Sequence, residues 1–333
     1  MDGLTTEQRQ LDQHDESSRR SASGLLAILL RPVAAPHAVR RWAVASLVAN
    51  IVIVVTGALV RLTASGLGCP TWPRCTDQSY VSHPELGVHG AIEFGNRLLT
   101  FVLVVVAVLT WVSALLYRDG GRPRRDLRWL TAGLALGIPA QAVIGGITVL
   151  TQLNPFVVAL HLLTSMVLIA LSVWLVRRTR DLRAQPVGGP AVLAARVAFV
   201  LMWLTVWLGT VVTGSGPHAG DHGAVRTGFD GVLVTHLHAA AVYGTVGATL
   251  VAVGLLRSRA AVLLLAVELL QAVLGVTQYH LGLPVGLVIL HLLGASLAVA
   301  ASTNLFLSVT PRQRPELSRG NGSAAAGRGS EPA

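Results

Sequence analysis

A histidine stands near the end of each of two similar segments of this chain. The segment QAVIGGITVLTQLNPFVVALHLL spans residues 141–163, and QAVLGVTQYHLGLPVGLVILHLL spans residues 271–293. Aligned without gaps, the two segments are identical at ten of 23 positions, and both end in LHLL. His161 and His291 thus each follow a glutamine by twenty residues. This pattern indicates an internal duplication that carries a chemical group.

Two more polar residues, Asn96 and His238, lie at a similar depth within other apolar segments. Ionisable residues inside a membrane span are rare and usually functional, and their matched depth disfavours the alternative of histidines that are only hydrogen-bonded in the core. Neutral imidazoles on facing antiparallel helices suit the axial positions of a heme iron. Zinc would need more donors than each half of the sequence offers.

The remaining histidines are weaker candidates. His236 lies about 200° around a helix from His238, so only one of them can face a given pocket. We favour His238, because the three alanines that follow it leave room for a flat macrocycle. We expect His218, His222 and His280 to be solvated in loops. His83 and His89 lie near the same surface, and His89 could share a helix face with Asn96.

The stretch IEFGNRLLTF, residues 92–101, contains Glu93, Asn96 and Arg97 at the start of an apolar segment. Glu93 and Arg97 could form an ion pair at i and i+4 that needs no substrate. Alternatively, Glu93 could lie near a reacting group and Arg97 near heme propionates. Cys69 and Cys75 are the only two cysteines and lie in a loop rich in glycine and proline. In an oxidising compartment we expect a disulfide between them, with a structural or a redox role.

The elements that position these residues are apolar segments. The 333 residues are 52% hydrophobic and 13% charged, which predicts a membrane protein. Segments long enough to span a bilayer lie at residues 42–62, 90–116, 129–150, 156–176, 197–214, 232–256, 260–278 and 284–307. With the duplication, they predict an all-α polytopic fold of eight transmembrane helices. We expect two pseudo-symmetric four-helix bundles, related as parallel repeats by an axis along the membrane normal.

The charge distribution predicts the orientation of the chain. The formal net charge is +10, and all 26 basic residues are arginines. Most of the arginines lie in the tails and in alternate connections. By the positive-inside rule, this distribution places both termini in the cytoplasm. The positive charge is thereby explained without a nucleic-acid partner. The expected organisation is an N-terminal tail, an N-terminal half, a cytoplasmic linker, a C-terminal half and a disordered C-terminal tail, at residues 1–41, 42–176, 177–196, 197–307 and 308–333.

Over residues 42–307 the chain resembles the heme A synthase family of bacteria. The resemblance rests on GALVRLTASGLGCPTWPRC, on EFGNR, on the two QAV segments with their histidines and on the eight-span layout. It implies oxidation of the C8 methyl group of heme O to a formyl group, which gives heme A for terminal oxidases. It also implies localisation in the plasma membrane, contact with membrane lipid, heme O synthase as a partner and an electron acceptor that the sequence does not identify.

The same resemblance implies the roles of individual residues. His238 and His291 would bind heme b in the C-terminal half, and His161 would face the substrate heme in the N-terminal half. Glu93 matches an acidic residue of the family, and we expect it to handle protons or to stabilise a cationic intermediate. Asn96 replaces the histidine of the family pattern E-x-x-H-R, and we expect it to hydrogen-bond near the iron while His161 alone binds it.

Two alternatives remain open from the sequence. One is a b-type membrane cytochrome in quinol-linked electron transfer, which would prefer two complete pairs of histidines. The other is a transporter, which parallel repeats also permit. A transporter would contain no heme, so the heme content of the purified protein separates it from the other readings.

Overall fold

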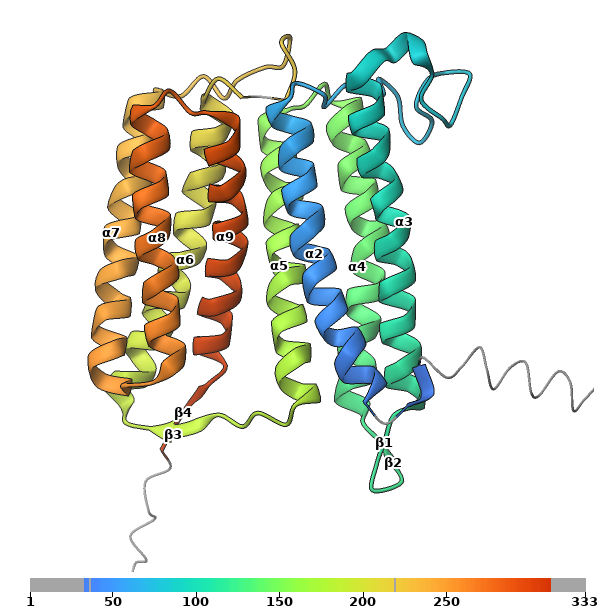
Figure 1. The fold of residues 1–333 in the computed structure, drawn as a ribbon. Coiled ribbons are helices and arrows are strands. Elements are labelled where there is room, and N and C mark those ends of the chain that lie inside the picture. Colours follow the sequence, from blue (N-terminus) through green and yellow to red (C-terminus); the bar gives the residue numbers. More distant parts are fainter. Residues whose placement is uncertain (1–32, 36, 219, 313–333) are drawn as a thin grey trace, which may run out of the picture.

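The computed structural model describes residues 33–35, 37–218 and 220–312. Within these ranges, eight helices are long and apolar enough to cross a membrane (Figure 1). They are α2 (Ala38–Leu62), α3 (Gly87–Leu116), α4 (Arg125–Leu150), α5 (Pro155–Thr179), α6 (Gly189–Ser215), α7 (Gly231–Leu256), α8 (Arg259–His280) and α9 (Val285–Phe306). A 3₁₀ turn, η1 (Pro84–Leu86), precedes α3. The predicted all-α fold with eight spans is confirmed.

Most of the helices begin before the apolar segments that predict them, and a capping side chain marks the start of α5, α7 and α8. Asn154 accepts a hydrogen bond from the backbone nitrogen of Phe156 at 3.0 Å, and Pro155 opens α5. Asp230 caps α7 in the same way, and α6 starts at Gly189, where the sequence predicts residue 197. The polar turns outside the apolar segments continue the helices, since backbone hydrogen bonding does not depend on apolar side chains.

The connections divide the molecule into two ends. We call the end formed by residues 63–86, 151–154, 216–230 and 281–284 the loop end. The opposite end, formed by residues 117–124, 180–188 and 257–258, is the arginine end. The described chain begins and ends at the arginine end (Figure 1). This is the arrangement that an even number of spans requires.

Each half of the chain forms a ring of four helices. In the N-terminal half, α2 packs against α3 and α5, and α4 packs against α3 and α5. The C-terminal half repeats this order with α6, α7, α8 and α9. Helices α3 and α5 therefore stand diagonally across one bundle, and α7 and α9 stand diagonally across the other (Figure 1). The exact symmetry of the predicted repeat stays a prediction.

The two bundles join along α2, α5, α6 and α9. Met166 and Ile169 of α5 and Val299 of α9 are fully buried in the largest apolar cluster, which extends over both halves. At the arginine end, buried Arg177 of α5 donates hydrogen bonds to the side-chain oxygen of Asn304 at 2.7 Å and to the backbone oxygen of Leu307 at 3.2 Å. Burial of apolar surface and these polar contacts hold the halves together.

Two pairs of short strands lie at the arginine end. Strands β1 (Arg118–Asp119) and β2 (Arg122–Pro123) form a hairpin between α3 and α4. Strand β3 (Gln185–Val187) pairs in parallel with β4 (Val309–Pro311). Part of the expected linker and the first residues of the expected disordered tail are thus paired with each other. Residues 1–32 and 313–333, where the sequence predicts most of the two tails, lie outside the described residues.

Candidate functional site

His161 lies near the loop end of α5 and packs against α4. A Cβ atom added at Gly145 would lie 3.2 Å from Cε1 of this imidazole, so the ring fits only because glycine has no side chain. The Nδ1 atom of His161 is buried and has no hydrogen-bond partner among the described residues. A buried polar atom without a partner is uncommon in a native protein, so the ring is positioned for a group that the polypeptide does not supply.

His238, near the loop end of α7, has a defined orientation. Its Nδ1 atom donates a hydrogen bond to the backbone oxygen of Thr205 at 3.0 Å. A Cβ atom added at Gly209 would lie 3.3 Å from its Cε1 atom. Because the donating nitrogen carries the proton, the Nε2 atom is left as the free electron-pair donor. This is the usual arrangement of a histidine that binds a metal.

His291 lies near the loop end of α9 and faces α8. Its ring approaches Gly275, where an added Cβ atom would lie 3.5 Å from Cε1, and its Nδ1 atom is buried without a partner in the described structure. His238 and His291 lie on diagonal helices of the C-terminal bundle, α7 and α9.

Asn96 occupies the corresponding place in the N-terminal bundle, on α3 and diagonal to His161. Its Oδ1 atom accepts a hydrogen bond from the hydroxyl of Thr56 at 2.8 Å. The amide oxygen is therefore occupied, and the amide NH₂ group makes no hydrogen bond within the described ranges. This orientation leaves a donor group, and not an acceptor, for any further contact.

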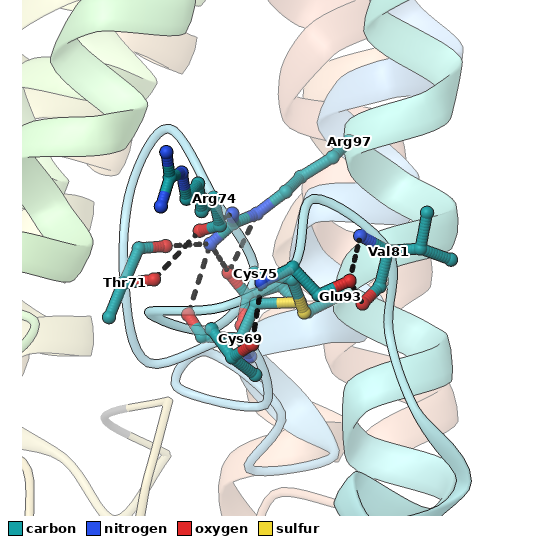
Figure 2. Close-up of a disulfide and its surroundings, with 9 residues drawn as sticks. Cys69, Thr71, Arg74, Cys75, Val81, Glu93 and Arg97 are labelled. Carbon is teal, nitrogen blue, oxygen red and sulfur yellow. Dashed lines mark hydrogen bonds and ion pairs between the residues drawn. A yellow bond between two sulfur atoms is a disulfide. The ribbon is translucent and has the colours of Figure 1, made fainter.

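Glu93 and Arg97 form a buried ion pair that holds the first loop (Figure 2). Arg97 donates to the Glu93 carboxylate at 2.6 Å, and the other carboxylate oxygen accepts from the backbone nitrogen of Cys69, also at 2.6 Å. Arg97 further donates to the backbone oxygens of Cys69, Thr71 and Arg74 at 3.0, 3.0 and 3.1 Å. The ion pair expected from the i, i+4 spacing is present, and Arg97 is engaged by protein groups.

The loop that Arg97 holds covers the N-terminal bundle at the loop end. Cys69 and Cys75 form a disulfide bond in the structure, with both residues fully buried (Figure 2). Between them, the indole of Trp72 packs directly on Gly146 of α4, the residue after the glycine that faces His161. The loop is thus fixed to α3 by charge and to α4 by packing.

The structure separates the other histidines from these sites. His236 is exposed and donates to the backbone oxygen of Val232 in its own helix. His89 bonds the hydroxyl of Ser65 at 2.9 Å. His222, His280 and His83 are exposed, as expected for His222 and His280. His218 differs from the expectation: it is half-buried and donates to the backbone oxygen of Leu283 at 3.0 Å.

Sequence reasoning gave no role to Arg61 of α2. Its guanidinium donates to the backbone oxygen of His218 at 2.7 Å and to that of Thr213 at 3.2 Å, so it joins the N-terminal half to the loop that follows α6. The sequence did contain one indication of a role for Arg61, namely a cation at the end of an apolar span. Its partners were not predictable, because they are backbone atoms at the end of α6 and in the loop that follows it, more than 150 residues away.

The donors present fit heme better than a bare metal ion. No group of three or more histidine, cysteine, aspartate or glutamate residues in the described chain could hold a metal ion. A metal bound by one or two imidazoles must bring its remaining ligands with it, as heme iron does. The glycines that face His161, His238 and His291, and the unpartnered ring nitrogens of His161 and His291, agree with such a group.

These features define a multi-pass helical membrane protein whose two bundles carry inward-facing imidazoles near one end. Comparison with known proteins identifies the family. Residues 40–303 match the family model COX15-CtaA, described as cytochrome oxidase assembly protein. Since the match covers well over half of the chain, this protein belongs to the heme A synthase family of cytochrome oxidase assembly proteins.

Curated relatives named heme A synthase are similar to parts of the chain. The protein from Listeria welshimeri is 29% identical over 178 residues, which are 51% of this chain and 57% of the relative. The protein from Methylorubrum populi is 31% identical over 211 residues, 54% of this chain and 55% of the relative. The chain thus spans a little over half the length of these relatives. The resemblance drawn from the sequence motifs is confirmed at the level of the family.

Replacing Arg97 tests how the first loop is held. In Arg97→Gln the loop loses the charged donor to the backbone oxygens of Cys69, Thr71 and Arg74. We expect amide hydrogen exchange in residues 69–75 to become about tenfold faster or more, because hydrogen bonds to a charged group contribute about 1.5–3 kcal/mol. The matched control is Arg74→Gln, whose exposed side chain bonds only the backbone oxygen of Asp77. Equal exchange in both variants would show that the disulfide and Trp72 hold the loop without Arg97.

Proposed function

We propose that this protein is a heme A synthase that oxidises the C8 methyl group of heme O to a formyl group. The observation that carries the proposal is the placement of inward-facing imidazoles against glycines in both bundles, in a chain of the heme A synthase family. The relatives' name supplies the reaction class, an oxidoreductase. The product, heme A, would serve terminal oxidases, in agreement with the description of the family.

The C-terminal half is proposed to hold heme b permanently. His238 and His291 would bind the iron from diagonal helices, and the hydrogen bond from His238 to Thr205 supports this role for His238 over the exposed His236. Two neutral imidazoles give a closed coordination shell. Such a shell suits electron transfer and not the exchange of a ligand.

The N-terminal half is proposed to take heme O as substrate. His161 would bind its iron. The NH₂ group of Asn96, on the helix diagonal to His161, would donate a hydrogen bond to a group near the iron. An amide donor is not a strong ligand of iron, so the substrate would be held by one strong bond. This difference suits a heme that must enter and leave, whereas the C-terminal heme stays.

Glu93 is proposed to hold or move protons during the oxidation, and Arg97 to position Glu93 and the loop. Conversion of a methyl group to a formyl group adds one oxygen atom and removes four electrons, in two successive two-electron steps through an alcohol. With water as the source of the oxygen atom, four protons leave with the four electrons. The heme supplies the redox chemistry when bound. Among the buried residues of the N-terminal half in the described structure, Glu93 is the carboxylate, which supports its choice as proton acceptor.

The proposal includes an orientation and partners. Both termini would lie in the cytoplasm, since arginines gather at the arginine end, and the two heme sites would lie toward the outer face of the plasma membrane. A heme O synthase would supply the substrate. An electron acceptor must remove the electrons, and nucleic acid is not a partner.

The experiment that tests the function is expression in a host that makes heme O but not heme A. We expect extracted hemes to include heme A when this chain is present, identified by chromatography against standards. An empty vector is the control. If heme O stays unconverted while the purified protein contains heme, the protein is a b-type cytochrome and not a synthase.

The proposed heme b ligands give a second prediction. His238→Ala and His291→Ala should each lose most of the C-terminal heme, because one imidazole does not replace the other. His236→Ala is the matched control from the same helix and should keep it. The measurement is the ratio of bound heme to protein and the visible spectrum of the reduced state. Loss of heme in His236→Ala with retention in His238→Ala would reverse the assignment.

Glu93→Gln separates proton transfer from positioning. The substitution keeps the size of the side chain and removes its negative charge. We expect heme A formation to fall about 10²-fold or more, the usual contribution of a general acid or base, while the C-terminal heme remains bound. The comparison is Arg97→Gln, which disturbs the same loop but keeps the carboxylate. An equal loss of activity in both variants would leave Glu93 only a positioning role.

A further inference from the structure

A second buried carboxylate, Glu268, lies in the middle of α8. It is 4% exposed, and its Oε1 atom accepts a hydrogen bond from the hydroxyl of Thr249 at 2.9 Å. Its Oε2 atom is buried and has no partner among the described residues. Ionisable groups at this depth are costly and are generally retained for a function, and no role assigned so far uses this one.

Glu268 is connected to the proposed heme ligand His238 by hydroxyl groups inside the bundle. Thr249, its partner, lies one turn from Thr245 on α7. The hydroxyl of Thr245 lies 2.9 Å from that of Thr205 on α6, and the backbone oxygen of Thr205 accepts the hydrogen bond from His238. The series is not a continuous chain of hydrogen bonds. Thr249 and Thr245 are about 5–6 Å apart on a helix face, and the hydroxyl and backbone oxygen of Thr205 are linked only through the residue itself.

The carboxyl group is specific to the C-terminal half. In the alignment of the two repeated segments, Ile138 of α4 corresponds to Glu268. The glutamines that follow also differ in their surroundings. Gln141 accepts a hydrogen bond from the hydroxyl of Thr164 and donates one to the hydroxyl of Ser165. Its counterpart Gln271 faces glycine and alanine at the equivalent positions 294 and 295, and its amide nitrogen is buried without a partner in the described structure.

Among the described side chains of this bundle, no other buried titratable group lies outside the two proposed iron ligands. His291 is the only titratable residue of α9, and His238 faces inward from α7; both would be occupied as iron ligands. The other titratable residues of α6, α7 and α8, with Arg257 after α7, are exposed: Arg196, His236, Tyr243, Arg257, Arg259, Tyr279 and His280. Glu268 forms no ion pair within the described ranges, so its charge is free to change.

We propose that Glu268 is the group that takes up a proton when the heme of the C-terminal half is reduced. The inference rests on the proposed binding of heme b by His238 and His291. A heme held by His238 and His291 would accept one electron released by oxidation of the substrate. One proton from water converts the Glu268 carboxylate to the carboxylic acid. The net charge of the bundle is then unchanged, which matters because an uncompensated charge is costly in a medium of low dielectric constant.

The test is a spectroelectrochemical titration of the purified holoprotein at several pH values. In the wild type, the midpoint potential of the C-terminal heme should fall as pH rises, with a slope of up to one proton per electron. In Glu268→Gln the slope should disappear, and in Glu268→Asp part of it should return. The matched control is Thr303→Val, another buried side chain with an unpartnered oxygen in the same half, which should keep the wild-type slope.

Infrared difference spectra between the oxidised and reduced states give an independent readout. The carboxylic acid C=O band that appears on reduction of the wild type should be absent in Glu268→Gln. If that variant does not retain heme, Thr249→Val is measured in its place and should shift the band, because the hydrogen bond to Oε1 is removed. A wild type without a pH slope, or a slope that Glu268→Gln leaves unchanged, overturns the inference. A wild type without bound heme overturns the proposed function instead.

Discussion

The interior of a membrane protein offers no water to polar side chains, and this constraint separates structural from functional groups here. Most buried hydroxyls are satisfied locally: Thr131 donates to a backbone oxygen four residues earlier in its own helix. A few buried side-chain atoms of the described residues are left without partners. They belong to Arg128, His161, Ser172, Glu268, Gln271, Gln278, His291 and Thr303. Because lipid offers no hydrogen bonds, a bound polar group or a change of protonation would be needed to satisfy His161, His291 and Glu268.

The two bundles share the same packing of glycine against imidazole but differ in their polar groups. In each, a helix presents a glycine to the imidazole of the following helix, at Gly145 for His161 and at Gly275 for His291. Only the N-terminal bundle is covered by a disulfide-bonded loop that an internal ion pair fixes. Among the described residues, the buried carboxylate without an ion pair, Glu268, belongs to the C-terminal bundle. Under the proposed function, this difference would suit one half to exchange of a heme and the other to storage of an electron.

Periodicity and composition predicted the eight helices because a span is a local property of about twenty residues. For the sites, some features were predictable from the sequence and others were not. The duplication located His161 and His291, and i, i+4 spacing found the pair Glu93 and Arg97, since these relations lie within short segments. The backbone acceptors of Arg97 and the contacts of His218 depend on how distant loops fold, which no local pattern encodes. Glu268 was overlooked although a carboxylate in the middle of a span is visible in the sequence.

The replacement of a histidine by Asn96 is consistent with the rest of the N-terminal bundle. A second imidazole there would close the coordination of iron, as is proposed for the C-terminal pair, and exchange would then require breaking a strong bond. Asn96 is instead oriented by Thr56 so that its NH₂ group is free, and an NH₂ group donates hydrogen bonds but does not bind iron. The hydrogen bond from Thr56 thus determines which chemistry Asn96 offers. Affinity in this half must come from His161 and from the apolar walls of the bundle, both compatible with release of a modified heme.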